Sequence, residues 1–524
     1  MKPRILCPLV LAALVAIAAC AKVEPVPVAA APQKAKPQIA WFDGSLDAAF
    51  ELARTQNKPV FLYWGAVWCP PCHKLSASVF SRHDFIEKSK LFVPVYLNGD
   101  EPGAQKAAED FKVVGYPSVV VLNGDRTELA RISGGMDLSM YGEVLDMVLR
   151  DVRPVSALLA TLDSAADLLT QDECRRLAYN DWFADDAYTG NPSGTSKALE
   201  TAAGRCPVTA TVERGRLLAV ATYMASRAER DALKAGKPPS KRLAGLVTRI
   251  GELLVDRSTA LGAADTLLSL GEDFFTAARQ GEQRQGEELL QQWLLLMDTI
   301  AVDPDFAVDD QIYAIANKLQ AVKSFGGETG IPPALAEAAQ RRVDAALANT
   351  TDADARSAVV NSVQLLYAVL GDNDRAYALL QQEIKTSKAP YYYLVDLAAL
   401  EEERGRKDEA IALLEHAYRD SKGAATRFQW ATEYVFGLLR MRPQDEARIR
   451  AGVLASLAEL EGADRIYGRT RIRLERLDTR LREWNKAGAH AAAIASFRQR
   501  MAGLCMQIQE KRPRGSCDAF LSKA

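Results

Sequence analysis

The sequence lacks an excess of either charge and is poor in cysteine and histidine. Its 524 residues include 65 Lys and Arg against 67 Asp and Glu, a formal net charge of −2. Because no basic excess is available to neutralise a phosphate backbone, we expect no nucleic-acid partner. Eight cysteines are too few for a miniature fold built on disulfides. A hydrophobic content of 48% excludes a disordered chain, and the length predicts about three domains or one domain with a long repeat array.

Long hydrophobic runs are scarce, and the clearest one lies near the N-terminus. Lys2 and Arg4 precede an apolar run over residues 5–19, which is short for a membrane span and typical of a secretory signal peptide. The run ends in Ile-Ala-Ala-Cys at Cys20 and resembles the lipobox of bacterial lipoproteins. That resemblance implies a signal peptide at 1–19, a lipid on Cys20 and sorting to the outer membrane. Cleavage as an ordinary signal peptide is the alternative.

Two segments follow the signal peptide. Residues 20–40 are rich in Pro and Ala and predict a semi-extended tether. Residues 41–153 alternate helical and strand patterns, which predicts an α/β domain with at least one parallel crossover. The patterns predict helices at 45–56, from 69 onward, at 102–111 and at 137–150, and strands at 60–64, 91–97, 118–122 and 129–132, with a hairpin turn at 123–125.

In the remaining segment, residues 154–524, strand signals almost vanish and apolar residues recur at helical spacing. We therefore expect an all-α array. Gly371 and the small and apolar residues after it recur from Gly405, a shift of 34 residues. This is the period of tetratricopeptide helix hairpins, and the segment near 356–450 resembles them. The resemblance implies a region that binds proteins, whereas unrelated hairpins that share a period by chance are the alternative.

The motif that carries chemistry is Trp68-Cys69-Pro70-Pro71-Cys72, at the point where a predicted strand gives way to a helix. The free N–H groups of the first helical turn should favour the thiolate form of Cys69, and Cys72 can then resolve a mixed disulfide. Pro70 and Pro71 suit a helix start, where an N–H has no partner to lose. Half of a zinc site is the alternative, but no second CxxC follows. We expect a redox-active dithiol with no metal and no other cofactor.

Three motifs together resemble the thioredoxin superfamily. They are the strand VFLYW at 60–64, the WCPPC motif, and Gly-Tyr-Pro at 115–117, which heads a later strand. Within the superfamily, the run KPVFLYWGAVWCPPCHKL looks closest to the C-terminal periplasmic domain of the thiol:disulfide interchange protein DsbD. The resemblance covers 41–153 and implies a thioredoxin-like α/β fold.

The same resemblance implies a role for each motif residue. Cys69 would be the nucleophile and Cys72 the resolving cysteine. Pro117 would follow a cis peptide bond, for which an X–Pro bond is chemically eligible. Tyr116 would offer backbone hydrogen bonds to a bound cysteine-containing peptide, and Trp68 would also contact that peptide.

The chain departs from the thioredoxin pattern beneath the motif. Tyr63 stands six residues before the first cysteine, where thioredoxins carry a buried acid, and Tyr96 replaces the partner lysine. Loss of both groups avoids an unpaired buried charge. Tyr63 and Tyr96 either pack and satisfy their hydroxyls, or Tyr63 helps proton transfer to Cys72. His73 and Lys74 are interpreted as solvated neighbours of the motif.

Four further cysteines and an acidic run require an interpretation. Cys174 pairs naturally with Cys206 and Cys505 with Cys517, because an exported protein in an oxidising compartment rarely keeps idle thiols. We expect two structural disulfides, with free buried thiols as the alternative. The aspartates at 303–310 lack the central Gly and terminal Glu of a calcium loop and are better explained as an acidic helix start.

These features predict an envelope-anchored thiol–disulfide oxidoreductase that faces the periplasm, with a helical protein-binding region. The expected partners are cysteine-containing client proteins, a redox partner protein in the envelope, and the membrane through the N-terminal lipid. The alternative is a scaffold lipoprotein with little turnover. The direction of electron flow depends on a reduction potential that the sequence does not encode.

Overall fold

The computed structural model describes residues 38–113, 115–132, 138–150, 153–162, 168–183, 186–268, 270–281, 283–325, 330–463, 465–508 and 519–522. From Gln38 onward the chain forms one compact unit. The predicted signal peptide, Cys20 and nearly all of the predicted tether lie outside the described residues, as does Cys517. In the described part of the chain, no helix is both long and apolar enough to cross a membrane.

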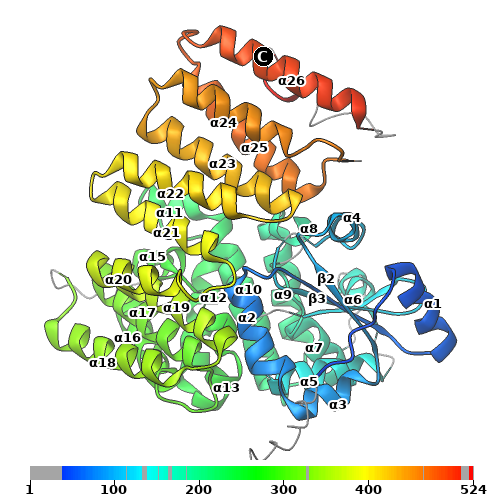
Figure 1. The fold of residues 1–524 in the computed structure, drawn as a ribbon. Helices are drawn as coiled ribbons and strands as arrows, with labels where there is room; N and C mark the ends of the chain where they lie inside the picture. The colour runs from blue at the N-terminus through cyan, green and yellow to red at the C-terminus, as the bar shows by residue number, and fades with distance from the viewer. Residues whose placement is uncertain are drawn as a thin grey trace, which may run out of the picture. The chain divides into compact units, whose positions relative to one another are not determined.

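The N-terminal part of the described chain, up to residue 150, is a small α/β domain (Figure 1). Its elements are α1 Leu46–Gln56, β1 Val60–Gly65, α2 Pro70–Leu75, the π-helical turn η1 Ser76–Phe80, α3 His83–Ser89, β2 Val93–Asn98, α4 Pro102–Asp110, β3 Ser118–Leu122, β4 Glu128–Ile132 and α5 Leu138–Val148.

The sheet has the strand order β2-β1-β3-β4. β1 and β2 are parallel, whereas β1 with β3 and β3 with β4 are antiparallel. The predicted parallel crossover and the predicted hairpin are therefore confirmed, although β2 begins at Val93, two residues later than expected. β1 is buried along its whole length because helices cover both faces of the sheet, which explains its unbroken apolar run.

Local sequence signals account for the helix ends in this domain. Ser45 caps α1 by accepting a hydrogen bond from the backbone N–H of Ala48 at 3.2 Å. Asn57 ends the helix in a left-handed conformation with φ of 50°. The buried face of α1 carries Ala49, Phe50 and Ala53. These residues belong to the same hydrophobic cluster as side chains of β1. The spacing of these residues is that of one helical face.

The rest of the described chain is helical, as predicted (Figure 1). Its helices are α6 Val155–Thr161, α7 Gln171–Ala178, α8 Asp186–Thr189, α9 Pro192–Arg205, α10 Thr211–Ala228, α11 Arg230–Lys234, α12 Lys241–Val255, α13 Arg257–Gly262, α14 Ala264–Leu267, α15 Glu272–Gly281, α16 Gln283–Ile300, α17 Val308–Phe325, α18 Pro333–Asn349, α19 Ala353–Leu370, α20 Asn373–Glu383, α21 Pro390–Glu403, α22 Lys407–Asp420, α23 Ala424–Met441, α24 Glu446–Ala458, α25 Gly468–Trp484 and α26 Ala491–Gln507.

The 34-residue repeat coincides with helix hairpins. Gly371 lies between α19 and α20, and Gly405 lies between α21 and α22, with φ of 72° and 77°. Both turns need the left-handed conformation that glycine adopts without strain. α21 packs on α22, α22 on α23, and α23 on α24, whereas α25 packs on α23 and α26 on α24. This packing is consistent with a tetratricopeptide-like array, in which each hairpin buries its apolar face against its neighbours.

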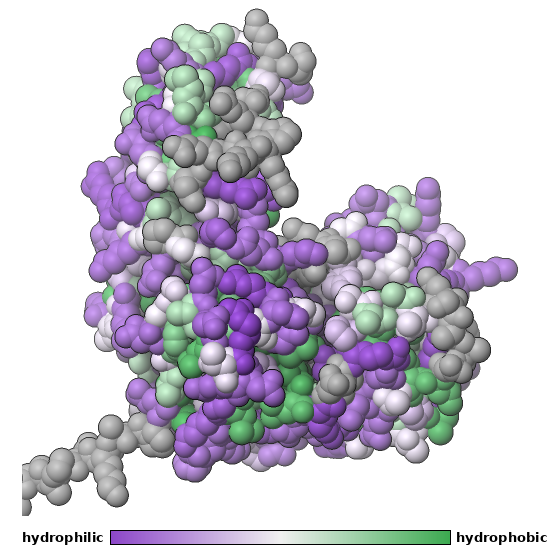
Figure 2. Space-filling model, turned by 90° about the vertical axis from the view of Figure 1, so that its right-hand side faces the viewer, coloured by the Kyte–Doolittle hydropathy of each residue, from purple (hydrophilic) through white to green (hydrophobic). Residues whose placement is uncertain are grey.

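The helical region is joined to the sheet from its first helices onward. Asn180, just after α7, forms an isolated β-bridge with Ile132 at the end of β4. The buried side chain of Arg176 donates to the carbonyl oxygen of Leu129. One hydrophobic cluster combines side chains beside β1 and α2 with Tyr391, Leu394 and Trp430 of the helical region. Figure 2 shows a mostly hydrophilic outer face in which hydrophobic side chains gather only in small patches.

Candidate redox site

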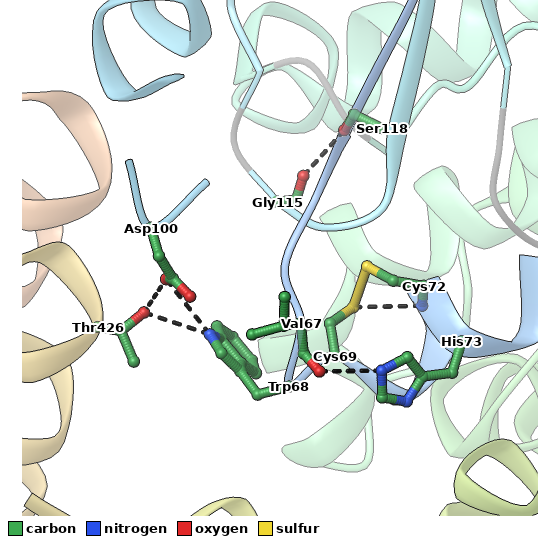
Figure 3. Close-up of a disulfide and its surroundings, with 9 residues drawn as sticks. All are labelled: Val67, Trp68, Cys69, Cys72, His73, Asp100, Gly115, Ser118 and Thr426. Atoms are coloured by element: carbon green, nitrogen blue, oxygen red, sulfur yellow. Dashed lines mark hydrogen bonds between the residues drawn. A yellow bond between two sulfur atoms is a disulfide. The ribbon is translucent and has the colours of Figure 1, made fainter. Parts of the chain in front are cut away.

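The CxxC motif lies at the transition from β1 to α2, and its cysteines form a disulfide (Figure 3). Cys69 is the N-cap of α2, and its Sγ accepts a hydrogen bond from the backbone N–H of Cys72 at 3.3 Å. Pro70 and Pro71 occupy the first turn, where their missing N–H groups leave no bond unmade. A thiolate on Cys69 would face both this N–H and the positive end of the helix dipole. The geometry therefore suits a nucleophile at Cys69.

The loop before β3 lies beside the motif. The Tyr116–Pro117 peptide bond is cis, and the hydroxyl of Ser118 donates to the carbonyl oxygen of Gly115 at 2.9 Å (Figure 3). The Tyr116 ring meets the Trp68 ring edge to face, with 5.6 Å between centroids. Burial raises the pKa of Tyr116 to about 12, so its hydroxyl stays neutral. Trp68 and Tyr116, which the sequence assigned to substrate binding together with Pro117, are thus in contact.

A hydrogen-bonded triad connects this face to the helical region. The indole N–H of Trp68 donates to Thr426 Oγ1 of α23 at 3.2 Å and to Asp100 Oδ1 at 3.4 Å. The Thr426 hydroxyl donates in turn to the same Asp100 oxygen (Figure 3). Burial raises the pKa of Asp100, and the hydrogen bonds from Thr426 and Trp68 oppose that rise. Three segments far apart in sequence therefore meet at Trp68.

Aromatic and cationic side chains of the helical region surround the same tryptophan. Tyr392 of α21 stacks on Trp68 with a centroid distance of 6.1 Å, and Trp430 of α23 approaches it edge-on at 6.3 Å. The guanidinium of Arg469 on α25 lies 5.1 Å from the Trp68 ring centroid and 4.3 Å from that of Tyr116. Such cation–π contacts are favourable where water is excluded. The helical region therefore supplies one wall of the redox site.

Lys74 keeps only 15% of its side-chain exposure and is engaged in ion pairs, so its interpretation as a solvated neighbour was wrong. Its ammonium lies 3.3 Å from a carboxylate oxygen of Asp309 and also pairs with Asp310, both in the first turn of α17. Burial alone would lower the pKa of Lys74, but the two carboxylates raise it above its ordinary value. Burial also raises the pKa of Asp310 to about 6, against the pull of Lys74. The acidic helix start predicted at 303–310 is thus an ion-pair partner of the CxxC helix.

Tyr63 and Tyr96 pair directly across β1 and β2. Their rings stack with centroids 5.3 Å apart. Burial raises the pKa of Tyr63 above its ordinary range and that of Tyr96 to about 12. Two neutral rings therefore occupy the positions that the resemblance associates with a buried acid and a lysine.

The redox pair itself is almost inaccessible. Cys69 and Cys72 each retain 3% of their exposure, and Trp68 retains 9%. Thiol–disulfide exchange requires an incoming sulfur to reach the attacked sulfur. An incoming sulfur therefore cannot reach Cys69 unless neighbouring side chains move.

The other predicted cysteine sites lie apart from the CxxC motif. Cys174 of α7 and Cys206, the C-cap of α9, form a disulfide that links neighbouring helices. Cys505 lies buried in α26, and Cys517, its expected partner, is outside the described residues. Among the described residues, no three His, Cys, Asp or Glu side chains are grouped as metal ligands.

Comparison with known proteins identifies a family match for the α/β part of the chain. A family model described as a thioredoxin-like domain matches residues 46–149. Residues 46–149 form a thioredoxin-like domain. A solved structure titled "DsbH Oxidoreductase" aligns with 25% of this chain and 92% of its own, at 20% identity and a TM-score of 0.20. No curated protein matches the chain.

Sequence reasoning located the thioredoxin-like motifs and missed the helical wall beside them. The wall residues belong to no redox motif, and each comes from an ordinary amphipathic helix. They are Thr426, Tyr392, Trp430 and Arg469. One local signal was available at Gly423, which precedes α23 with φ of 79°. A Cβ there would lie 2.6 Å from the Cβ of Asp100, so this glycine permits close approach of α23 to the thioredoxin-like domain.

Proposed function

We propose that the chain is a thiol–disulfide oxidoreductase that acts on protein cysteines through Cys69 and Cys72. The observation that carries the proposal is the Cys69–Cys72 disulfide at the N-terminus of α2, beside a cis-proline loop. The helix terminus stabilises a thiolate on Cys69, and Cys72 lies one turn away with its backbone N–H on the same sulfur. No further cofactor is needed, because the dithiol itself carries two electrons.

The exchange proceeds in two balanced steps. In the reducing direction, the Cys69 thiolate attacks one sulfur of a client disulfide, the client S–S bond breaks, and the leaving sulfur takes up a proton. Cys72 then loses its proton and attacks Cys69 Sγ, which forms the Cys69–Cys72 disulfide and releases the second client sulfur. A dithiol partner protein restores the reduced pair by the reverse sequence. The reduction potentials of the pair and of its partners select the direction.

Trapping of mixed disulfides tests these roles. Cys72→Ser should accumulate mixed disulfides with client proteins, because Cys69 can attack but nothing resolves the product. Cys69→Ser should trap almost none and is the matched control. The adducts can be counted by non-reducing electrophoresis and identified by mass spectrometry. Equal trapping by the two variants would contradict the assignment.

The location of this activity is a second part of the proposal. We infer from the N-terminal sequence that the mature chain begins at Cys20, carries acyl chains and resides at the bacterial envelope facing the periplasm, on the outer membrane. Membrane fractionation and mass spectrometry of the N-terminus test this. An unmodified N-terminus at another residue would reject the lipid anchor and leave the redox proposal intact.

A binding protein with little turnover is the second candidate function. The specific observation in its favour is the 3% exposure of Cys69. The two candidates differ in one measurement, because an oxidoreductase reduces many equivalents of a client disulfide when a dithiol is supplied, whereas a scaffold reduces at most one.

A further inference from the structure

The face through which a client would approach Cys69 is already occupied by the chain itself. The indole N–H of Trp68 donates to Thr426, and the ring stacks on Tyr392 and lies against the guanidinium of Arg469. The ring of Tyr116, beside the cis-proline, also lies against Arg469. A folded client would have to replace these contacts before its sulfur could approach Cys69. The helical wall therefore competes with clients for one surface.

We propose that the helices packed around the redox site, α17, α19, α21, α23 and α25, act as an intramolecular cover, so that protein thiols and disulfides exchange with Cys69–Cys72 only when the cover is displaced. The inference rests on the proposed function, since it concerns access to the same disulfide. It adds a conformational control that the thioredoxin-like domain alone would not have. Small dithiols need a smaller opening than a folded protein and so should be less affected by the cover.

The cover fits the thioredoxin-like domain closely. Gly423, with φ of 79°, starts α23 directly against Asp100, where a Cβ would lie 2.8 Å from the Asp100 carbonyl oxygen. A side chain at this position would push the N-terminus of α23 away. The close fit places Thr426 within hydrogen-bond reach of both Asp100 and Trp68 (Figure 3). The contact is therefore a formed interface rather than loose proximity.

The same interface leaves polar groups unsatisfied, which makes opening less costly. Trp430 Nε1 and Arg469 Nη1 are buried and have no hydrogen-bond partner among the described residues. A buried donor without a partner loses the hydrogen bond that water would give it. Displacement of the cover would return both groups to water. The closed arrangement is thus specific in shape but incompletely satisfied, which suits a reversible cover.

Ion pairs at the edge of the cover offer a way to open it without replacing a residue of the CxxC motif. Glu109 of α4 pairs with Arg465, which precedes α25, at 2.9 Å, and the two side chains are 27% and 34% exposed. On another side, Lys74 pairs with Asp309 and Asp310 of α17. Like charges placed across an interface repel, and removal of the two carboxylates leaves the half-buried ammonium of Lys74 without these partners. Either change should favour the open arrangement.

The test compares two reductants on the oxidised full chain. Dithiothreitol and a reduced thioredoxin both transfer two electrons: one thiolate attacks the Cys69–Cys72 disulfide, Cys72 leaves and takes up a proton, and the second thiol releases Cys69. The product is two thiols on the chain and one disulfide on the reductant. Alkylation and mass spectrometry give both second-order rate constants. The decisive quantity is the rate constant for thioredoxin divided by that for dithiothreitol.

The variants are Glu109→Arg, the charge swap Glu109→Arg/Arg465→Glu, and Asp309→Asn/Asp310→Asn. We expect the ratio of the thioredoxin to the dithiothreitol rate constant to rise about tenfold in Glu109→Arg and in Asp309→Asn/Asp310→Asn, a change equivalent to about 1.4 kcal/mol. In the charge swap the ratio should return to the wild-type value. Arg284→Glu, at a pair 86% and 65% exposed on α16, is the matched control and should leave the ratio unchanged.

An unchanged ratio in both opening variants would overturn the cover while leaving the redox function standing. The cover would also be overturned if the wild-type chain reacted with thioredoxin as fast as the opened variants do. If Glu109→Arg does not fold, the asparagine variant decides, because it preserves side-chain volume. Failure of dithiothreitol to reduce the disulfide in every variant would instead refute the proposed function, since a disulfide that no dithiol reduces cannot exchange.

Discussion

The carboxyl group of Asp396 provides a quantitative test of how the cover is packed. Asp396 lies in α21, one turn after Tyr392, the residue that stacks on Trp68. Burial raises the pKa of Asp396 from 3.8 to about 6, and the side-chain amide of Gln364 opposes the rise. The native chain therefore holds the Asp396 proton more tightly than the unfolded chain does.

The sign of the pH dependence follows from this difference. Below pH 3.8 Asp396 is protonated in both states and contributes no difference. Between pH 3.8 and about pH 6 the native state binds more protons than the unfolded state, so stability falls as the pH rises. Above about pH 6 the loss of stability is complete. At about 1.4 kcal/mol for each pKa unit, the shift from 3.8 to about 6 lowers the free energy of unfolding by at most about 3 kcal/mol.

Asp396→Asn should remove this loss, because an amide of nearly the same shape has no charge to bury. We expect the variant to be more stable than the wild type by about 1 to 3 kcal/mol at pH 7.5 and equal to it near pH 4. Urea unfolding at several pH values, followed by circular dichroism, measures the free energy of unfolding. Asp374→Asn, at a carboxylate 95% exposed, is the control and should follow the wild-type profile. Parallel profiles for wild type and Asp396→Asn would refute the reasoning.

Three further changes test other parts of the structure. Replacement of Cys174 and Cys206 together by Ala opens a 32-residue loop and should cost about 3 to 4 kcal/mol of unfolding free energy in urea, whereas dithiothreitol reduction of the CxxC pair should keep its rate. Ala410→Glu buries a charge at a position with 0% exposure and should lower the melting temperature by several degrees, while Ala410→Ser should lower it less. Gly423→Ala places a Cβ against Asp100 at a positive φ and should cost about 1 to 3 kcal/mol while it raises the reactivity of the CxxC pair with protein thiols; unchanged reactivity would contradict the close fit.

The sequence was informative wherever the signal is local. The strand VFLYW, the hairpin at 123–125 and the helix start at Cys69 depend on residues within a few positions of each other, and the structure contains all three. The glycine period predicted the hairpin turns at Gly371 and Gly405 for the same reason, since each turn needs a left-handed residue. These predictions required no knowledge of distant contacts.

The environment of the motif could not be predicted in this way. Lys74 pairs with Asp310, 236 positions away, and Trp68 donates to Thr426, 358 positions away. A lysine after a CxxC motif has the same local pattern whether it meets water or a carboxylate. Burial at such a distance depends on how the helical array folds back, which periodicity within one helix does not encode. The acidic start of α17 was visible, but its partner was not.

The two tyrosines beneath the motif give this packing a chemical consequence. An effective general acid has a pKa near the working pH, whereas burial raises the pKa of Tyr63 above its ordinary range. This favours a packing role for Tyr63 over proton transfer to Cys72, and its stacking on Tyr96 at 5.3 Å agrees. The proton that Cys72 releases or accepts must then pass to water or to the client. Because both cysteines are 3% exposed and α19 packs on their helix, we infer that displacement of the cover would admit the client and the proton acceptor together.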